Sequence, residues 1–153
     1  MKLCIMPRNP HTFIASYLLL IQDGKVLLLR RFNTGYRDGD YSVPAGHVEP
    51  GDSFTQTMIR ESNEEIGIML KEEDLKVSHI MHRMNEYQDR ESIDTFFTAL
   101  QWIETPENKE PEKCDDLSWF PVDNLPENTI PYVRQAIEHS VNDIFYSEYG
   151  WKE

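Results

Sequence analysis

Glu61, Glu64 and Glu65 stand at positions i, i+3 and i+4, a spacing that places three carboxylates on one face of a helix. Three like charges within one turn repel one another. A solvated helix face tolerates that repulsion, so an acidic stripe in an acidic chain is one interpretation. The other is a binding site for a hard divalent cation, since Mg²⁺ and Mn²⁺ prefer oxygen ligands and commonly use a few carboxylates together with substrate phosphates.

The segment that carries these glutamates has the clearest helical pattern in the chain. Apolar residues recur with helical spacing from Ser53 to Ile66. Asp52 precedes this segment as the expected N-cap, and Gly67 follows it as the expected C′ residue. The sequence therefore predicts a helix over residues 53–66 that presents its carboxylates along one side.

Apolar runs on both sides of this helix predict strands. Phe13–Ile21 and Val26–Leu29 are expected to pair as an antiparallel hairpin through a turn at Asp23 and Gly24. The further expected elements are a loop over 31–40, extended pieces at Tyr41–Pro44 and His47–Val48, strands at Leu75–Met81, Ser92–Ile103 and Leu117–Pro121, a surface loop over 104–116, and a closing helix at Ile130–Val141. Strands, helix, strands and helix in this order predict one α+β domain over residues 1–153, with its core at about 12–142.

Composition limits the classes of function. The net charge of −12 over 153 residues counts against a main partner that is duplex nucleic acid or an anionic membrane. It permits a small phosphorylated substrate, because a divalent cation can bridge carboxylates to phosphates. No apolar run reaches the roughly 18 residues of a membrane span. Cys4 and Cys114 lie far apart and have no metal-ligand spacing, so we expect a reducing, cytoplasmic location.

The spacing around the glutamates resembles the Nudix box, G-x5-E-x7-R-E-U-x-E-E-x-G-U, where U is a bulky aliphatic residue. The positions that coincide are Gly46, Arg60, Glu61, Glu64, Glu65 and Gly67. Such a match arises by chance about once in 10⁷ windows. Asp52 replaces the first glutamate of the box and Ser62 replaces its aliphatic residue, but neither change touches the glutamate face. The resemblance covers roughly residues 12–140.

Resemblance to the Nudix family implies an α/β/α sandwich with a mixed central sheet. It also implies a hydrolase that cleaves a nucleoside diphosphate linked to a group X with the help of Mg²⁺ or Mn²⁺. A MutT-like pyrophosphohydrolase that converts a (deoxy)nucleoside triphosphate to the monophosphate is the leading interpretation, favoured slightly because we recognise no extra N-terminal domain. The alternatives are hydrolysis of ADP-ribose, a nucleotide sugar or a dinucleoside polyphosphate, and a non-catalytic module that binds a nucleotide.

The resemblance also assigns roles to residues. Glu61, Glu64 and Glu65 are the expected cation ligands, and Glu61 or Glu64 would also take the proton of the attacking water. Arg60 is expected to orient a glutamate. The further expected contacts are the Ala45 carbonyl and Glu112 to the metal, with Glu110 as second choice for the loop glutamate, Arg31 to a phosphate, and Asn128 to the base.

The expected partners follow from the same resemblance and from the charge. They are a small-molecule nucleotide, no duplex nucleic acid and no membrane, and a homodimer is allowed. The acidic excess is concentrated in the box, where five acidic residues over 46–67 oppose Arg60, and in residues 104–128, where eight oppose two lysines. Residues 1–45 have the opposite balance, with six basic residues against three acidic ones.

Overall fold

The computed structural model describes residues 12–152. Cys4 lies outside this range, as do Lys2 and Arg8, two of the six basic residues counted above over 1–45. The helices are α1 (Phe54–Ile66), α2 (Pro131–Val141) and the short 3-10 helix η1 (Glu72–Asp74). The strands are β1 (Phe13–Leu19), β2 (Ile21–Gln22), β3 (Lys25–Arg31), β4 (Tyr41–Ser42), β5 (Ala45–His47), β6 (Leu75–Met84), β7 (Glu91–Ala99), β8 (Cys114–Pro121) and β9 (Tyr146–Tyr149).

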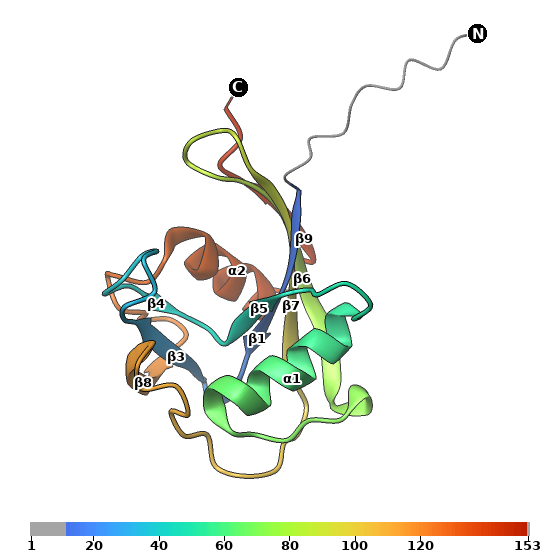
Figure 1. Ribbon diagram of the computed structural model, residues 1–153, viewed down its shortest axis with the longest axis vertical. Coiled ribbons are helices and arrows are strands. Elements are labelled where there is room, and N and C mark those ends of the chain that lie inside the picture. Colours follow the sequence, from blue (N-terminus) through green and yellow to red (C-terminus); the bar gives the residue numbers. More distant parts are fainter. Residues whose placement is uncertain (1–11, 153) are drawn as a thin grey trace, which may run out of the picture.

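Two sheets organise these strands (Figure 1). The larger is mixed and has the order β5-β1-β7-β6-β9, in which β1 is parallel to β7 and β6 is parallel to β9. The pairs β1 with β5 and β6 with β7 are antiparallel. In the second sheet β3 pairs antiparallel with β2, β4 and β8. None of the helices between residues 12 and 152 has the length and apolar character needed to cross a membrane.

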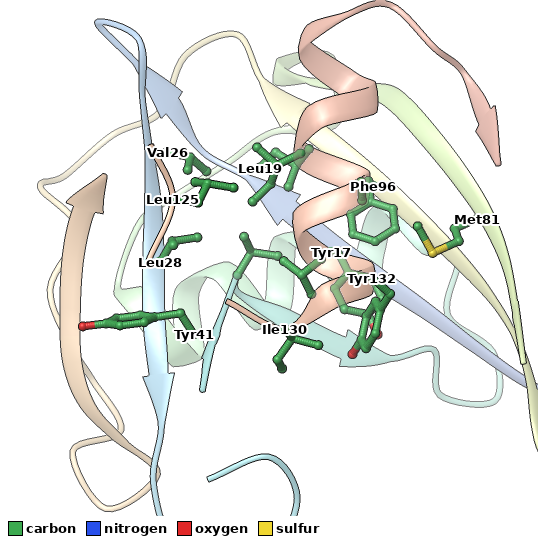
Figure 2. Packing of buried hydrophobic residues seen from close by; sticks show 14 of the residues in the cluster. Tyr17, Leu19, Val26, Leu28, Tyr41, Met81, Phe96, Leu125, Ile130 and Tyr132 are labelled. Carbon is green, nitrogen blue, oxygen red and sulfur yellow. The ribbon is translucent and has the colours of Figure 1, made fainter. Parts of the chain in front are cut away.

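The central strand β1 is buried on both faces, and alternate residues face opposite helices. Tyr17 and Leu19 belong to the core cluster that includes the apolar face of α2 (Figure 2). Leu18 and Leu20 belong to the other cluster, which contains Met58 of α1. Because the two helices cover opposite faces of this sheet, the predicted α/β/α sandwich is confirmed.

The predicted hairpin at Asp23 and Gly24 is only partly correct. Both residues have positive φ, 52° and 72°, as a tight hairpin turn requires. Only the two residues of β2 pair with β3, however, whereas β1 ends at Leu19 and pairs with β5 and β7 instead. The position of β1 between β5 and β7 explains the uninterrupted apolar run of its sequence, since a strand covered on both faces shows no polar alternation.

The other element boundaries shift, and one strand escaped prediction. β7 ends at Ala99, four residues before the predicted Ile103, and β8 starts at Cys114, so the connection between them covers 100–113 in place of the predicted 104–116. β9 lies beyond the predicted core limit of residue 142, so the larger sheet extends past that limit. β9 pairs with β6 at residues 146–149, and such a short, half-exposed edge strand has little hydrophobic pattern to reveal it.

Ser53, not the predicted Asp52, is the N-cap of α1. Its hydroxyl accepts a hydrogen bond from the Gln56 N–H at 3.1 Å, and the Gln56 side chain accepts one from the Ser53 N–H at 2.9 Å. The Asp52 carboxylate lies instead 3.6 Å from the Arg60 guanidinium. At the other end Gly67 has φ 70° and donates its N–H to the Asn63 carbonyl, as predicted for a C-terminal glycine.

We therefore expect Ser53→Ala to lower the free energy of unfolding by about 1 kcal/mol, because the backbone N–H of Gln56 loses its partner. Asp52→Asn is the matched control. It removes only a partly exposed ion pair and should cost less than about 0.5 kcal/mol. Urea denaturation of both variants measures the difference. A larger loss in Asp52→Asn than in Ser53→Ala would contradict the assignment of the cap.

Candidate functional site

The three glutamates of α1 line one cavity of about 580 Å³, as their spacing predicted. The wall opposite the helix comes from β3 and from the loop before β8, which contribute Arg31 and Glu110. Five carboxylates, those of Glu49, Glu61, Glu64, Glu65 and Glu110, therefore line this cavity together with the cationic side chains of Arg31, Arg60 and Lys113.

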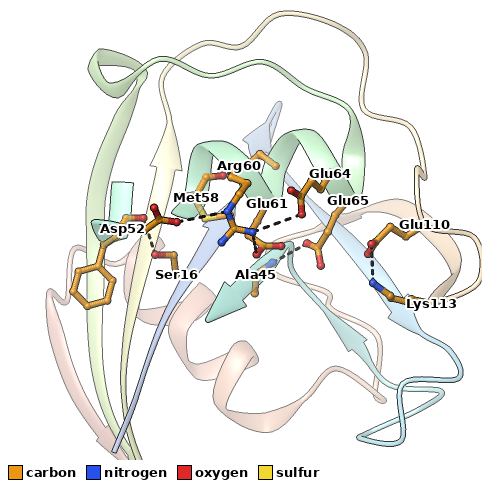
Figure 3. A network of polar contacts seen from close by, with 12 residues as sticks. Ser16, Ala45, Asp52, Met58, Arg60, Glu61, Glu64, Glu65, Glu110 and Lys113 are labelled. Atoms are coloured by element: carbon orange, nitrogen blue, oxygen red, sulfur yellow. Dashed lines mark hydrogen bonds and ion pairs between the residues drawn. The ribbon is translucent and has the colours of Figure 1, made fainter. Parts of the chain in front are cut away.

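Arg60 is the centre of a charge network on the face of α1 (Figure 3). Its Nη1 donates a hydrogen bond to Glu61 Oε1 at 2.7 Å and lies 3.6 Å from Glu64 Oε2. Nε and Nη2 of the same guanidinium are buried and make no hydrogen bond. Burial raises the pKa of Glu61, and the nearby Arg60 charge partly offsets that rise. Arg60 thus contacts two of the glutamates that the sequence analysis expected it to orient.

Glu65 occupies the innermost position of the cluster. Its Oε2 accepts a hydrogen bond from the Ala45 N–H at 2.9 Å, which joins α1 to β5. Burial raises the pKa of Glu65 to about 8; the Ala45 hydrogen bond works against the rise, and the charges of Glu61 and Glu110 add to it. A carboxyl group with this pKa keeps its proton at pH 7 unless a cation takes the place of that proton.

The donor chemistry of the cavity suits a hard divalent cation. Across residues 12–152 no three acidic, histidine or cysteine side chains hold their donor atoms together around one point. Glu61 and Glu64 turn to Arg60, Glu65 turns to Ala45, and Glu110 pairs with Lys113 at 2.8 Å. Arg60 and Lys113 thus partly neutralise Glu61, Glu64 and Glu110, a role that a bound cation would take over. Carboxylate oxygens are the ligands that Mg²⁺ and Mn²⁺ prefer. The thiol of the lining, that of Cys114, donates to the Asp116 carbonyl at 3.2 Å.

The remaining predicted site residues divide into two groups. Ala45 and Arg31 line the cavity. Arg31 donates from Nε to the Tyr36 carbonyl at 2.6 Å and from Nη2 to Thr34 Oγ1 at 3.0 Å, and it has no carboxylate partner among the described residues. Its charge is therefore available to a phosphate.

Glu112 and Asn128 do not line the cavity. Glu112 is exposed, and Glu110, the second choice for the loop glutamate, lines the wall in its place. The loop shows no periodic pattern, so the sequence alone could not show which of these two glutamates faces the cavity. Asn128 donates its side-chain amide to the Gly39 carbonyl at 2.7 Å, so it fastens the loop before β4.

Comparison with known proteins agrees with the geometry. The NUDIX domain model matches residues 11–139. The chain belongs to the NUDIX family. This family consists of hydrolases that generally use divalent metals and act on small nucleotides. The MutT NUDIX hydrolase from Burkholderia pseudomallei superposes with a TM-score of 0.76 over 84% of this chain and 97% of that one, at 23% identity.

A further relative in sequence and a further solved structure of similar fold carry different names. The NAD-capped RNA hydrolase NudC of Stutzerimonas stutzeri is 31% identical over 130 residues, which is 85% of this chain and 43% of that protein. The chain therefore spans less than half the length of this relative. The Francisella tularensis bifunctional NMN adenylyltransferase/ADP ribose pyrophosphatase, solved with AMP and a Mn ion, has a TM-score of 0.70 at 20% identity. It covers 91% of this chain and 43% of its own.

The glycine that opens the NUDIX box has a steric reason for its place. A Cβ atom at Gly46 would overlap the side chain of Glu61, whose carboxylate lies against this strand. Gly46 has no positive φ, so backbone freedom does not explain it. Its missing side chain is what lets Glu61 occupy the cavity.

We expect Gly46→Ala to lower turnover by about tenfold or more, because it displaces the Glu61 carboxylate from its position. The free energy of unfolding should change much less, since the overlapping group is a flexible side chain. Steady-state kinetics and urea denaturation together measure both effects.

A double-mutant cycle supplies the control. If Gly46→Ala acts through Glu61, it should cause little further loss in a Glu61→Gln background. Equal losses in the two backgrounds would contradict the steric role of Gly46.

Proposed function

We propose that this chain is a divalent-cation-dependent hydrolase that cleaves a phosphoanhydride bond in a nucleoside diphosphate linked to a further group X. The observation that carries the proposal is the meeting of Glu61, Glu64, Glu65 and Glu110 with Arg31 in one cavity. A bound Mg²⁺ or Mn²⁺ would screen the diphosphate and stabilise the charge that develops in the displacement.

The residues of the chain then divide the remaining tasks. Glu64 and Glu65 hold the cation together with Glu110, and the Ala45 backbone lies beside them. Glu61 serves as a further ligand or takes the proton of the attacking water. Arg60 keeps Glu61 and Glu64 turned toward the cavity, and Arg31 binds an anionic oxygen of the diphosphate, which guanidinium groups match well.

The identity of X separates two candidate substrates. In a nucleoside triphosphate X is the terminal phosphate, and the MutT structure resembles this chain closely in fold. In ADP-ribose or a dinucleotide X includes a further sugar, and relatives named for NAD-capped RNA and ADP-ribose favour this second candidate. A second cavity adjoining the carboxylates gives room for such a group.

A substrate panel with Mg²⁺ and with Mn²⁺ tests the proposal. We expect at least one nucleoside triphosphate, dinucleotide or ADP-sugar to be cleaved, with release of a nucleoside monophosphate or pyrophosphate. Glu65→Gln should lower turnover by about 10²-fold or more, because it removes a ligand charge while it keeps the size and the hydrogen bond to Ala45. Chromatography of the products measures both the bond cleaved and the rate.

The control is Glu72→Gln, at an exposed glutamate of η1. It should retain wild-type turnover. No product above background with either metal, or equal turnover of Glu65→Gln and wild type, would contradict the proposed function.

A further inference from the structure

A second cavity of about 420 Å³ adjoins the carboxylate cavity. Arg31 and Ala45 line both, so a substrate bound at the carboxylates can extend past Ala45 into the second space. The other walls come from the start of β1, from β5, from the β6–β7 hairpin and from the first turn of α2. The proposed function gives this second cavity no task beyond providing room.

The charge of the second cavity is opposite to that of the chain. Its lining includes Arg31, Arg83, Arg90 and His47, and no aspartate or glutamate. This occurs in a protein of net charge −12. A concentrated positive lining in an acidic protein favours an anionic ligand over a neutral one.

Each of these arginines lies over an aromatic ring. Arg83 lies 4.1 Å from the centroid of Tyr132, Arg31 lies 5.3 Å from that of Tyr36, and Arg90 lies 5.5 Å from that of Phe13. Such contacts hold a guanidinium in place while its edge stays available for hydrogen bonds. The cavity therefore presents three positioned cationic groups.

The three guanidinium groups differ in how far the described residues neutralise their charge. Arg31 and Arg90 form no ion pair within the described part of the chain. Arg83 donates from Nε to Asp94 at 2.6 Å and from Nη2 to Ser92 at 3.3 Å, which leaves Nη1 without a partner there. Asp94 fixes Arg83 from behind, since its side chain is fully buried.

We propose that this cavity binds a further phosphate group of the substrate, such as a phosphate on a ribose of a dinucleotide, at a position remote from the bond that is cleaved. A phosphomonoester carries nearly two negative charges and several acceptor oxygens, which match several guanidinium groups better than one carboxylate does. The proposal rests on the proposed function only in naming the phosphate as part of a substrate. Whether the cavity binds phosphate can be measured without any hydrolysis.

Binding in the absence of metal tests the cavity without requiring turnover. Calorimetry compares adenosine 2′,5′-bisphosphate with adenosine 5′-monophosphate, which differ only in the second phosphate. We expect the bisphosphate to bind wild-type protein about tenfold more tightly, a difference typical of one good charged contact. Arg90→Gln should reduce this ratio to within about threefold of unity, whereas Lys76→Gln, at an exposed residue of β6 outside the cavity, should keep it.

Kinetics with NADPH and NADH provide the second arm, because these dinucleotides differ in the same phosphate. We expect a higher kcat/KM for NADPH and loss of that preference in Arg90→Gln. A ratio near unity in wild type, or an equal loss for both ligands in Arg90→Gln, overturns the inference. Hydrolysis of both dinucleotides at equal rates would support the proposed function and contradict this inference. Preferential binding of the bisphosphate without hydrolysis of any substrate would support this inference and contradict the proposed function.

Discussion

Repulsion among the carboxylates on α1 is the constraint on which this structure depends. Glu61, Glu64 and Glu65 lie within one turn of helix, and Glu110 faces them across a cavity. Arg60 compensates two of these charges directly, at 2.7 Å and 3.6 Å, while Glu65 responds to burial with a pKa raised to about 8. A helix face arranged in this way is costly for the protein alone and becomes favourable when a cation binds.

Packing on the other side of α1 holds that face in position. Met58 and Ile66 are fully buried against the sheet, and Ser62 lies between them with its hydroxyl bonded to the Met58 carbonyl at 2.6 Å. A serine where the box has an aliphatic residue thus remains satisfied within the helix. Ser16 of β1 donates to the Phe54 carbonyl at 2.8 Å and ties the first turn of α1 to the central strand.

Local patterns predicted the helix, its glutamate face and the turn at Asp23 and Gly24, because each depends on residues close together in the sequence. Pairing of β1 with β7 could not be predicted in this way. It joins residues nearly 80 positions apart, and many partners would bury the same apolar run. The N-cap, in contrast, was predictable from local sequence, since Ser53 and Gln56 have the spacing of the capping box that the structure shows.

For the site, too, local patterns were predictable and long-range contacts were not. The spacing of the box located the α1 carboxylates, but Glu110 and the arginines of the second cavity reach their places only through the tertiary fold. Arg83 and Arg90 come from the β6–β7 hairpin, which the sheet order brings beside β1. Asn128 appeared to be a base contact from its place in a loop, yet its amide is used to hold the Gly39 carbonyl.

The central claim is that the crowded carboxylates form a cation site, and direct titration of Mn²⁺ tests it most simply. Electron paramagnetic resonance of free Mn²⁺ measures binding to the wild-type protein and to a variant with Glu61, Glu64 and Glu65 all changed to glutamine. Circular dichroism checks that the variant remains folded. The account predicts saturable binding to the wild type and an affinity at least about 100-fold lower in the variant. Equal binding by the two folded proteins would contradict it.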